Sequence, residues 1–170
     1  MDLYEAIETR RSIRKFNAEP VTDDDIHQCL KCAMLAPSAR NQQPWQFMVI
    51  RDAAMRESVS KASPYSGMAA EAPVVIVVCG DLSLETAPGF WPTDCAAATQ
   101  NLLLAARGRN LGTVWCGIHP VKEREDFLKN VLALPKEIIP FALVCLGHSE
   151  VAFRALDRFR ADRVHEGSWT

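Results

Sequence analysis

The 170-residue sequence contains no apolar run near the roughly 20 residues that cross a bilayer, and its first residues do not resemble an export signal. It also lacks an excess of either charge. Its 19 lysines and arginines face 21 aspartates and glutamates, and the net charge of −2 excludes a globally basic nucleic-acid-binding protein. We therefore expect a cytoplasmic protein that engages neither a membrane nor nucleic acid. A length of 170 residues, 48% of them hydrophobic, predicts a single domain with one core spanning residues 1–170.

Several catalytic and ligand-binding signatures are missing. No GxGxxG occurs, which argues against a Rossmann-type dinucleotide site. There is no Ser/His/Asp pattern and no pair of carboxylates at catalytic spacing. The histidines are scattered and predict no metal site; they are His27, His119, His148 and His165.

The six cysteines lack the spacing of a disulfide framework or a zinc site. Four lie in or beside apolar stretches, where a free cysteine acts as a small hydrophobe: Cys79, Cys95, Cys116 and Cys145. Cys29 and Cys32 form a CxxC motif without a second ligand pair. Because the motif falls within a predicted helix, two ordinary helix-face residues are favoured over a redox pair, although the pattern alone does not decide.

Helical and strand patterns alternate along the chain. Helices are predicted at residues 2–9, 22–36, 52–60, 93–107 and 120–132. Strands are predicted at residues 45–51, 74–80, 112–118 and 138–147. Pro140 within the last strand predicts either an edge position or an irregular start. The mixture indicates an α+β or α/β domain with a central sheet.

Two segments carry apolar residues that predict contacts within the core or with a second chain. The helix at 93–107 is apolar almost all round, which predicts burial in the core or in an interface. The tail at 148–170 alternates aromatic residues with arginines without a regular period. We expect this tail to wrap its own domain or to dock on a partner chain.

Three short stretches could hold a ligand. Residues 10–15 (RRSIRK) gather four cations and a hydroxyl, which suits a phosphate but equally suits a solvated turn. Residues 36–45 (APSARNQQPW) form a polar loop stiffened by two prolines; its side chains could bind a ring edge or merely cap their own backbone. Residues 112–118 (GTVWCGI) combine glycines with a Trp-Cys strand end, which suits a flat ligand or a buried strand.

Taken together and in this order, the stretches RRSIRKF, APSARNQQPWQF, DCAAATQNLLLAARGRNLGTVWCG and DRFRADRVHEGSW resemble the nitroreductase family of flavoproteins. The resemblance runs from about Leu3 to Trp169. It implies an α+β fold with a central mixed or antiparallel sheet flanked by helices. It also implies an intertwined homodimer that exchanges C-terminal arms (residues 148–170) and holds FMN at its interface.

The resemblance assigns the site residue by residue. The FMN phosphate, ribityl chain and N1–C2=O side would be held by Arg10, Arg11, Ser12 and Arg14, with Arg11 the weakest member. The phosphate site would be completed by Arg158 and Arg154. The other subunit would contribute Pro37, Ser38, Ala39 and Asn41. The strand passing flavin N5 would contribute backbone groups of Trp115, Cys116 and Gly117.

The implied activity is an FMN-dependent oxidoreductase. NADH or NADPH would donate hydride to flavin N5, and a nitroaromatic, quinone or similar small acceptor would receive it in a ping-pong mechanism. No protein acid, base or nucleophile is expected to be catalytic, and Arg14 is the candidate cation that tunes the flavin. The alternatives are an FMN-binding dimer without turnover, acting as a flavin sensor or carrier, and a specialised reductive reaction on the same scaffold.

Two features depart from the family pattern. The tail lacks the Pro- and Lys-rich sequence of many relatives, and the chain is too short for a long helical excursion over the flavin. Residues 61–72 and 81–92 are therefore all that could cover the substrate face, and Phe90 and Trp91 are candidate lid aromatics.

Overall fold

A computed structural model describes residues 1–169, so Thr170 of the predicted arm lies outside the described residues. The predicted elements occur in the predicted order, with ends shifted by up to three residues. The helices are α1 (Leu3–Thr9), α2 (Asp23–Ala33), α3 (Ala53–Val59), α4 (Trp91–Gly108) and α5 (Lys122–Val131). The strands are β1 (Trp45–Ile50), β2 (Val74–Asp81), β3 (Leu111–Gly117) and β4 (Ile138–His148). The α+β class is confirmed.

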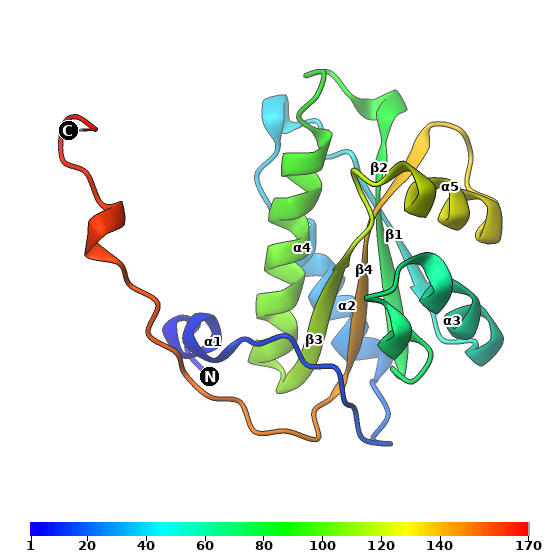
Figure 1. Cartoon of the computed structure of the whole chain (residues 1–170), viewed down its shortest axis with the longest axis horizontal. Helices are drawn as coiled ribbons and strands as arrows, with labels where there is room; N and C mark the ends of the chain where they lie inside the picture. The colour runs from blue at the N-terminus through cyan, green and yellow to red at the C-terminus, as the bar shows by residue number, and fades with distance from the viewer. Residues whose placement is uncertain (170) are drawn as a thin grey trace.

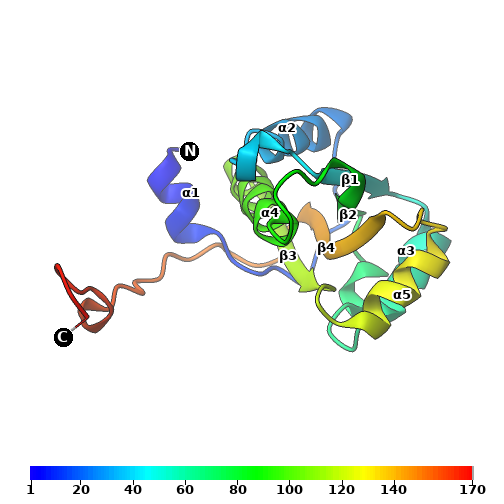
Figure 2. The same cartoon turned by 90° about the horizontal axis from the view of Figure 1, so that it is seen from above.

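The four strands form one antiparallel sheet in the order β1-β2-β4-β3. Helices α2 and α4 cover one face and α3 and α5 the other (Figures 1 and 2). Side chains of β2 alternate between the two faces: Ile76 joins the α2/α4 core, and Val75 and Val77 join the α3/α5 core. A strand with both faces covered needs a continuous apolar run, which explains the sequence VVIVVCG.

Helix α2 begins at a capping box, in which Asp25 N donates to Thr22 Oγ1 and Thr22 N donates to the Asp25 carboxylate. It ends at Ala33, three residues before the predicted end. Cys29 is fully buried, and burial raises the pKa of its thiol to about 12. A buried protonated thiol within a helix is consistent with Cys29 and Cys32 as helix-face residues.

The structure decides between the two placements predicted for Pro140. Strand β4 is an inner strand, not an edge strand, because it pairs with both β2 and β3. Residues 138–140 extend beyond the end of β3, and the β2–β4 register shifts between Val78 and Cys79. Pro140 therefore occupies an irregular start of the strand, where its missing N–H costs no ladder bond to β3.

The two ends of the chain stand away from the body of the domain (Figure 2). Helix α1 buries only Ala6 and leaves Leu3, Tyr4 and Ile7 exposed. The tail exposes Phe159 and Trp169, with relative accessibilities of 76% and 84%. It does not wrap its own domain, so the expectation that it docks on a partner chain is the one still open.

Arg107, which is only 6% exposed, fastens these two ends to α4. Its Nε donates to Thr9 Oγ1 over 2.8 Å, and its guanidinium carbon lies 3.9 Å from the centre of the Phe153 ring. None of the helices within residues 1–169 has the length and apolarity needed to span a membrane.

Truncating Ile76 tests the two-sided burial of β2. Ile76→Ala leaves a cavity beneath α2 and α4, so the free energy of unfolding should fall by about 2–5 kcal/mol in urea titrations. Val49 is paired with Ile76 on β1 but is 37% exposed, and Val49→Ala should cost less than about 1 kcal/mol. Equal losses in the two variants would contradict the packing described.

Candidate functional site

The segment that carries the first predicted motif bonds to the outer edge of β3 at residues 12 and 13 and to the end of β4 at residues 16 and 17. Ile13 N donates to Thr113 O over 2.8 Å, and Ser12 forms a parallel bridge with Thr113. Gly112 permits this approach, because a Cβ at that position would lie 2.8 Å from Ile13 Cγ2. The bridge is the one parallel pairing beside the otherwise antiparallel sheet in residues 1–169.

A cluster of guanidinium groups lies at the start of this segment. Burial lowers the pKa of Arg10, and the charges of Arg11 and of Arg158 from the tail lower it further. Arg11 is engaged by carbonyls at the end of α1, those of Glu8 and Arg10. Among residues 1–169, no carboxylate forms an ion pair with these three arginines. Cations gathered without a counter-charge suit a phosphate group.

A cavity of about 410 Å³ lies further along the same edge, at the end of β3. It is lined by Arg14, Pro64, Tyr65, Gly67, Met68, Val114, Trp115, Cys116, Gly117 and Arg124. Four predicted site residues thus meet here: Arg14, Trp115, Cys116 and Gly117. Arg14 forms no hydrogen bond or ion pair to another residue in the described chain, so its charge is available to a ligand.

The side chain of Cys116 turns into the core rather than acting on a ligand. Its Sγ lies 3.5 Å from Tyr65 O and 3.7 Å from Met68 Sδ, and it is only 4% exposed. A hydrogen bond with Cys145 lowers the pKa of Cys116, and the charge of Arg14 adds to this against the effect of burial. The same hydrogen bond and burial raise the pKa of Cys145. At Cys116, the end of β3 therefore offers its backbone, and not the thiol, to a ligand in the cavity.

Tyr65 and Met68 come from residues 61–72, a segment expected to cover the substrate face, whereas Arg124 was not foreseen from the sequence. Arg124 Nη1 donates to Gly117 O over 2.8 Å and so fixes the peptide at the end of β3. Its guanidinium also lies 5.9 Å from the centre of the Tyr65 ring. Helix α5 delivers Arg124 from seven residues downstream of Gly117, and the only local signal was its place in the helix predicted at 120–132.

The second predicted motif, residues 36–45, lies near the start of α4, whereas the arginine cluster lies near the end of this helix (Figure 1). Ala39 N donates to the buried carboxylate of Asp94 over 3.0 Å, whereas Arg107 near the other end of α4 holds Thr9. Asp94 and Arg107 are 13 positions apart, so with a rise of about 1.5 Å per residue these levels are separated by roughly 20 Å. One chain therefore does not bring Pro37, Ser38, Ala39 and Asn41 to the arginine cluster.

The remaining predicted residues lie in different surroundings. Arg158 approaches Arg10, while Arg154 forms no hydrogen bond or ion pair within residues 1–169. Trp91 is a core residue and not a lid: it is 8% exposed, lies 4.6 Å from the His119 ring, and a Cβ at Gly80 would clash with it. Phe90 is 54% exposed and stays a lid candidate.

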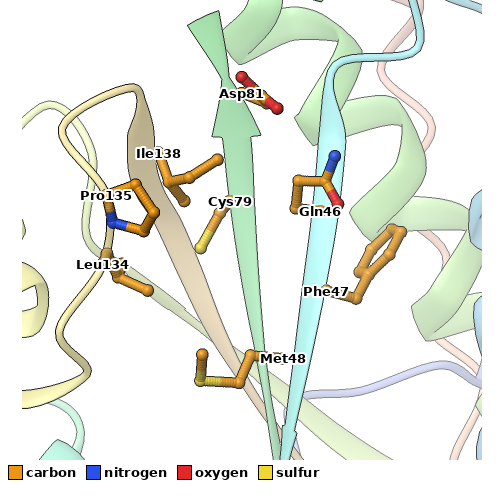
Figure 3. Close-up of a pocket in the computed structure, with 8 residues that line it drawn as sticks. All are labelled: Gln46, Phe47, Met48, Cys79, Asp81, Leu134, Pro135 and Ile138. Carbon is orange, nitrogen blue, oxygen red and sulfur yellow. The ribbon is translucent and has the colours of Figure 1, made fainter. Parts of the chain in front are cut away.

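A separate cavity of about 360 Å³ contains none of the predicted residues. Figure 3 shows its lining, which comes from β1, β2, the start of β4 and the loop before it. Burial raises the pKa of Cys79 to about 12, so its thiol is protonated, and Asp81 Oδ1 is already bonded to Ser83. Within residues 1–169, no three His, Cys, Asp or Glu side chains gather into a potential metal site. The cavity on β3 is thus the candidate site.

The structure defines an α+β protein with one antiparallel sheet and a cavity at the end of β3, and comparison with known proteins gives the family. The model of the nitroreductase family matches residues 7–64 and 56–148. The chain belongs to this family.

Relatives of similar length support the assignment. The chain is 43% identical over 169 residues to a "Putative NADH dehydrogenase/NAD(P)H nitroreductase" of Methanothermobacter thermautotrophicus, covering 99% of this chain and 88% of that protein. It is 44% identical to a protein of the same name from Archaeoglobus fulgidus, covering 96% of each. A solved structure described as "Putative NADH Oxidase" from Clostridium acetobutylicum superposes with a TM-score of 0.94 at 38% identity, covering 96% and 99% of the two chains.

Adding a methyl group at Gly112 should loosen the segment that carries Arg10 to Arg14. In Gly112→Ala the new Cβ meets three side-chain atoms of Ile13 within 3.0 Å, so the Ile13 N–H to Thr113 O bond should open more often. Amide hydrogen exchange should show faster exchange at Ile13. The matched control is Gly117→Ala, because a Cβ there meets nothing within 4 Å. Unchanged protection of Ile13 in Gly112→Ala would refute this contact.

Proposed function

We propose that the protein is an FMN-dependent oxidoreductase that takes hydride from NAD(P)H and passes it by a ping-pong mechanism to a nitroaromatic, a quinone or a similar small acceptor. One observation carries the proposal beyond family membership. The unpaired arginines at residues 10–14 and the cavity at the end of β3 lie along one strand edge, in the order that an elongated ligand with a phosphate at one end requires.

The residues present fit FMN. Five extended residues from Arg10 to Arg14 span roughly 13 Å, which separates a phosphate-binding end from a ring-binding end. Arg10, Ser12 and Arg158 would hold the phosphate, with Arg11 adding charge from α1. Arg14 would face the N1–C2=O side of the ring, and the backbone of residues 115–117 would pass its N5.

The chain's own contribution is position and electrostatics. When bound, FMN supplies the redox chemistry, because its N5 can accept a hydride and donate it to a second substrate. Arg14 would offset the negative charge that gathers near N1–C2=O on reduction. Arg124 would keep the peptide at Gly117 fixed through its bond to Gly117 O. Cys116 would contribute its backbone only, since its thiol is buried.

A second copy of the chain would complete the site. The face of α4 that carries Ala96, Ala97 and Leu104 is only half buried, and α1 and the tail expose large apolar side chains. We propose a homodimer in which C-terminal arms are exchanged and residues Pro37, Ser38, Ala39 and Asn41 of one subunit approach the flavin of the other. This arrangement would cover the exposed apolar surface and close the open side of the cavity.

Relatives support both cofactor and donor. A relative from Bacillus subtilis, 25% identical over 165 residues, is named "FMN reductase [NAD(P)H]". A relative from Salmonella typhimurium, 30% identical over 149 residues, is named "Oxygen-insensitive NADPH nitroreductase". A structure from Desulfovibrio desulfuricans, 30% identical with a TM-score of 0.85, is described as a complex with FMN. We propose that NADH or NADPH serves as the donor here.

The visible spectrum and steady-state kinetics test the function. The purified protein should be yellow and carry about one FMN per chain. NADH or NADPH should bleach it without oxygen, and reciprocal plots with menadione or nitrofurazone should give parallel lines. A yellow protein that does not turn over would instead indicate a flavin sensor or carrier. A colourless protein that takes up no added FMN would rule out the flavoenzyme assignment altogether.

Removing either cation should weaken FMN retention. Losing one charge-assisted hydrogen bond costs about 1.5–3 kcal/mol, so Arg10→Ala or Arg14→Ala should raise the FMN dissociation constant roughly 10- to 150-fold in fluorescence titrations. Arg51→Ala is the control, because Arg51 pairs with Asp23 on the surface away from the cavity. Wild-type affinity in both test variants would reject the placement of the cofactor.

A further inference from the structure

We propose that Asp94 and Gln42 form a positioning pair that holds residues 38–43 in the one conformation able to contact the partner's flavin. The inference rests on the proposed function and deepens it by assigning roles to two residues outside the predicted site. Both lie on the side of the loop that faces its own domain. Their task would be to fix the loop, while Ser38 and Asn41 make the contact.

The loop adopts a conformation that its residues do not favour. Arg40, Asn41 and Gln43 have φ angles of 50°, 54° and 47°, in the left-handed region that suits glycine. Three such non-glycine residues within four positions need outside contacts to hold them. Stored backbone strain of this kind is typical of ligand-contacting segments, where it fixes the groups presented to the ligand.

Asp94 supplies the first contact. Its Oδ1 accepts from Ala39 N over 3.0 Å, and its Oδ2 accepts from Gln42 Nε2 over 2.7 Å. The side chain belongs to α4 and the residue is only 4% exposed. A buried carboxylate is costly unless its oxygens are hydrogen-bonded, and here each oxygen is bonded to a different part of the loop.

Gln42 extends the contact to a third segment. Its Oε1 accepts from Thr86 N and from Ala87 N, each over 2.9 Å, while its amide nitrogen donates to Asp94. Arg40 Nη1 adds a bond to Thr86 O over 2.8 Å. The loop, the start of α4 and residues 86–87 are thereby tied together through one amide and one carboxylate.

The remaining loop bonds show which groups stay available. Gln43 N donates to Ser38 Oγ over 3.0 Å, and Gln43 Nε2 donates to Asn41 Oδ1 over 2.8 Å. Within the described chain, the Asn41 Nδ2 group and the Ser38 hydroxyl proton have no acceptor. Asp94 and Gln42 thus occupy the hydrogen-bonding groups on the side of the loop that faces the domain. The Asn41 Nδ2 group and the Ser38 hydroxyl stay available as donors to a ligand.

The direction of each hydrogen bond allows an exchange test. In Asp94→Asn, an NH₂ group faces one of the two donors, Ala39 N or Gln42 Nε2, and that bond is lost. In Gln42→Glu, the new carboxylate faces the carboxylate of Asp94, so each single variant breaks the pair. In the double variant D94N/Q42E the bonds can reform. The amide introduced at position 94 can accept from Ala39 N and donate to one oxygen of the carboxylate introduced at position 42. The other oxygen of that carboxylate can accept from Thr86 N and Ala87 N.

The experiment measures the FMN dissociation constant, the rate at which NADH reduces the bound flavin under anaerobic stopped flow, and the melting temperature. Each single variant should weaken FMN binding at least tenfold and slow reduction of the FMN-saturated protein at least tenfold. The double variant should recover both values to within about threefold of wild type. Gln46→Glu, an exposed glutamine on β1 outside this network, controls for added negative charge and should match wild type.

The outcomes separate this inference from the proposed function. If single variants lower only the melting temperature, while saturated protein is reduced at the wild-type rate, the pair is merely structural and the inference fails. A folded double variant that keeps the defects of the single variants also overturns it. If a single variant does not fold, recovery in the double variant still supports the pairing. Wild-type protein that neither binds FMN nor is reduced removes the proposed function, and this inference with it.

Discussion

The antiparallel pairing of β2 with β4 is the constraint on which the rest of the molecule depends. Both strands are buried, and β2 sends alternate side chains into two separate cores. The pairing places β1 and β3 at the outer edges. Residues 12 and 13 bond to the β3 edge, and a cavity forms where β3 ends. The candidate site is thus a consequence of sheet order, because an order with β3 inside the sheet would bury this edge.

Helix α4 connects the two parts of the predicted site and also keeps them apart. Near its first turn it holds the strained loop through Asp94, and near its last turn it holds α1 and the tail through Arg107. A rigid helix between the two groups means that neither can move to the other within one chain. The separation supports the proposal that a second copy of the chain completes the site.

Much of the fold could be predicted from the sequence, because the decisive signals are local. The β-branched run of β2, the capping box at Thr22 and Pro37 after α2 mark element ends within three residues. Strand order is not local, and so the sequence left both an edge position and an irregular strand start open for Pro140. The residues of the site also fall into those that a local motif predicts and those that it does not. Arg14 and residues 115–117 lie in recognisable motifs, whereas Arg124, Tyr65 and Asp94 reach their partners only through tertiary packing. The roles of the motif residues toward FMN stay predictions.

Subunit complementation tests the proposed two-chain site most directly. One variant would carry Arg10→Ala and Arg14→Ala, and the other Asn41→Arg, so that each homodimer has two damaged sites. Co-expression with different tags allows the mixed dimer to be isolated. If each site combines residues 10–14 of one chain with the loop of the other, the mixed dimer holds one intact site and binds one FMN. A mixed dimer that binds no more FMN than either parent would contradict a site shared between two chains.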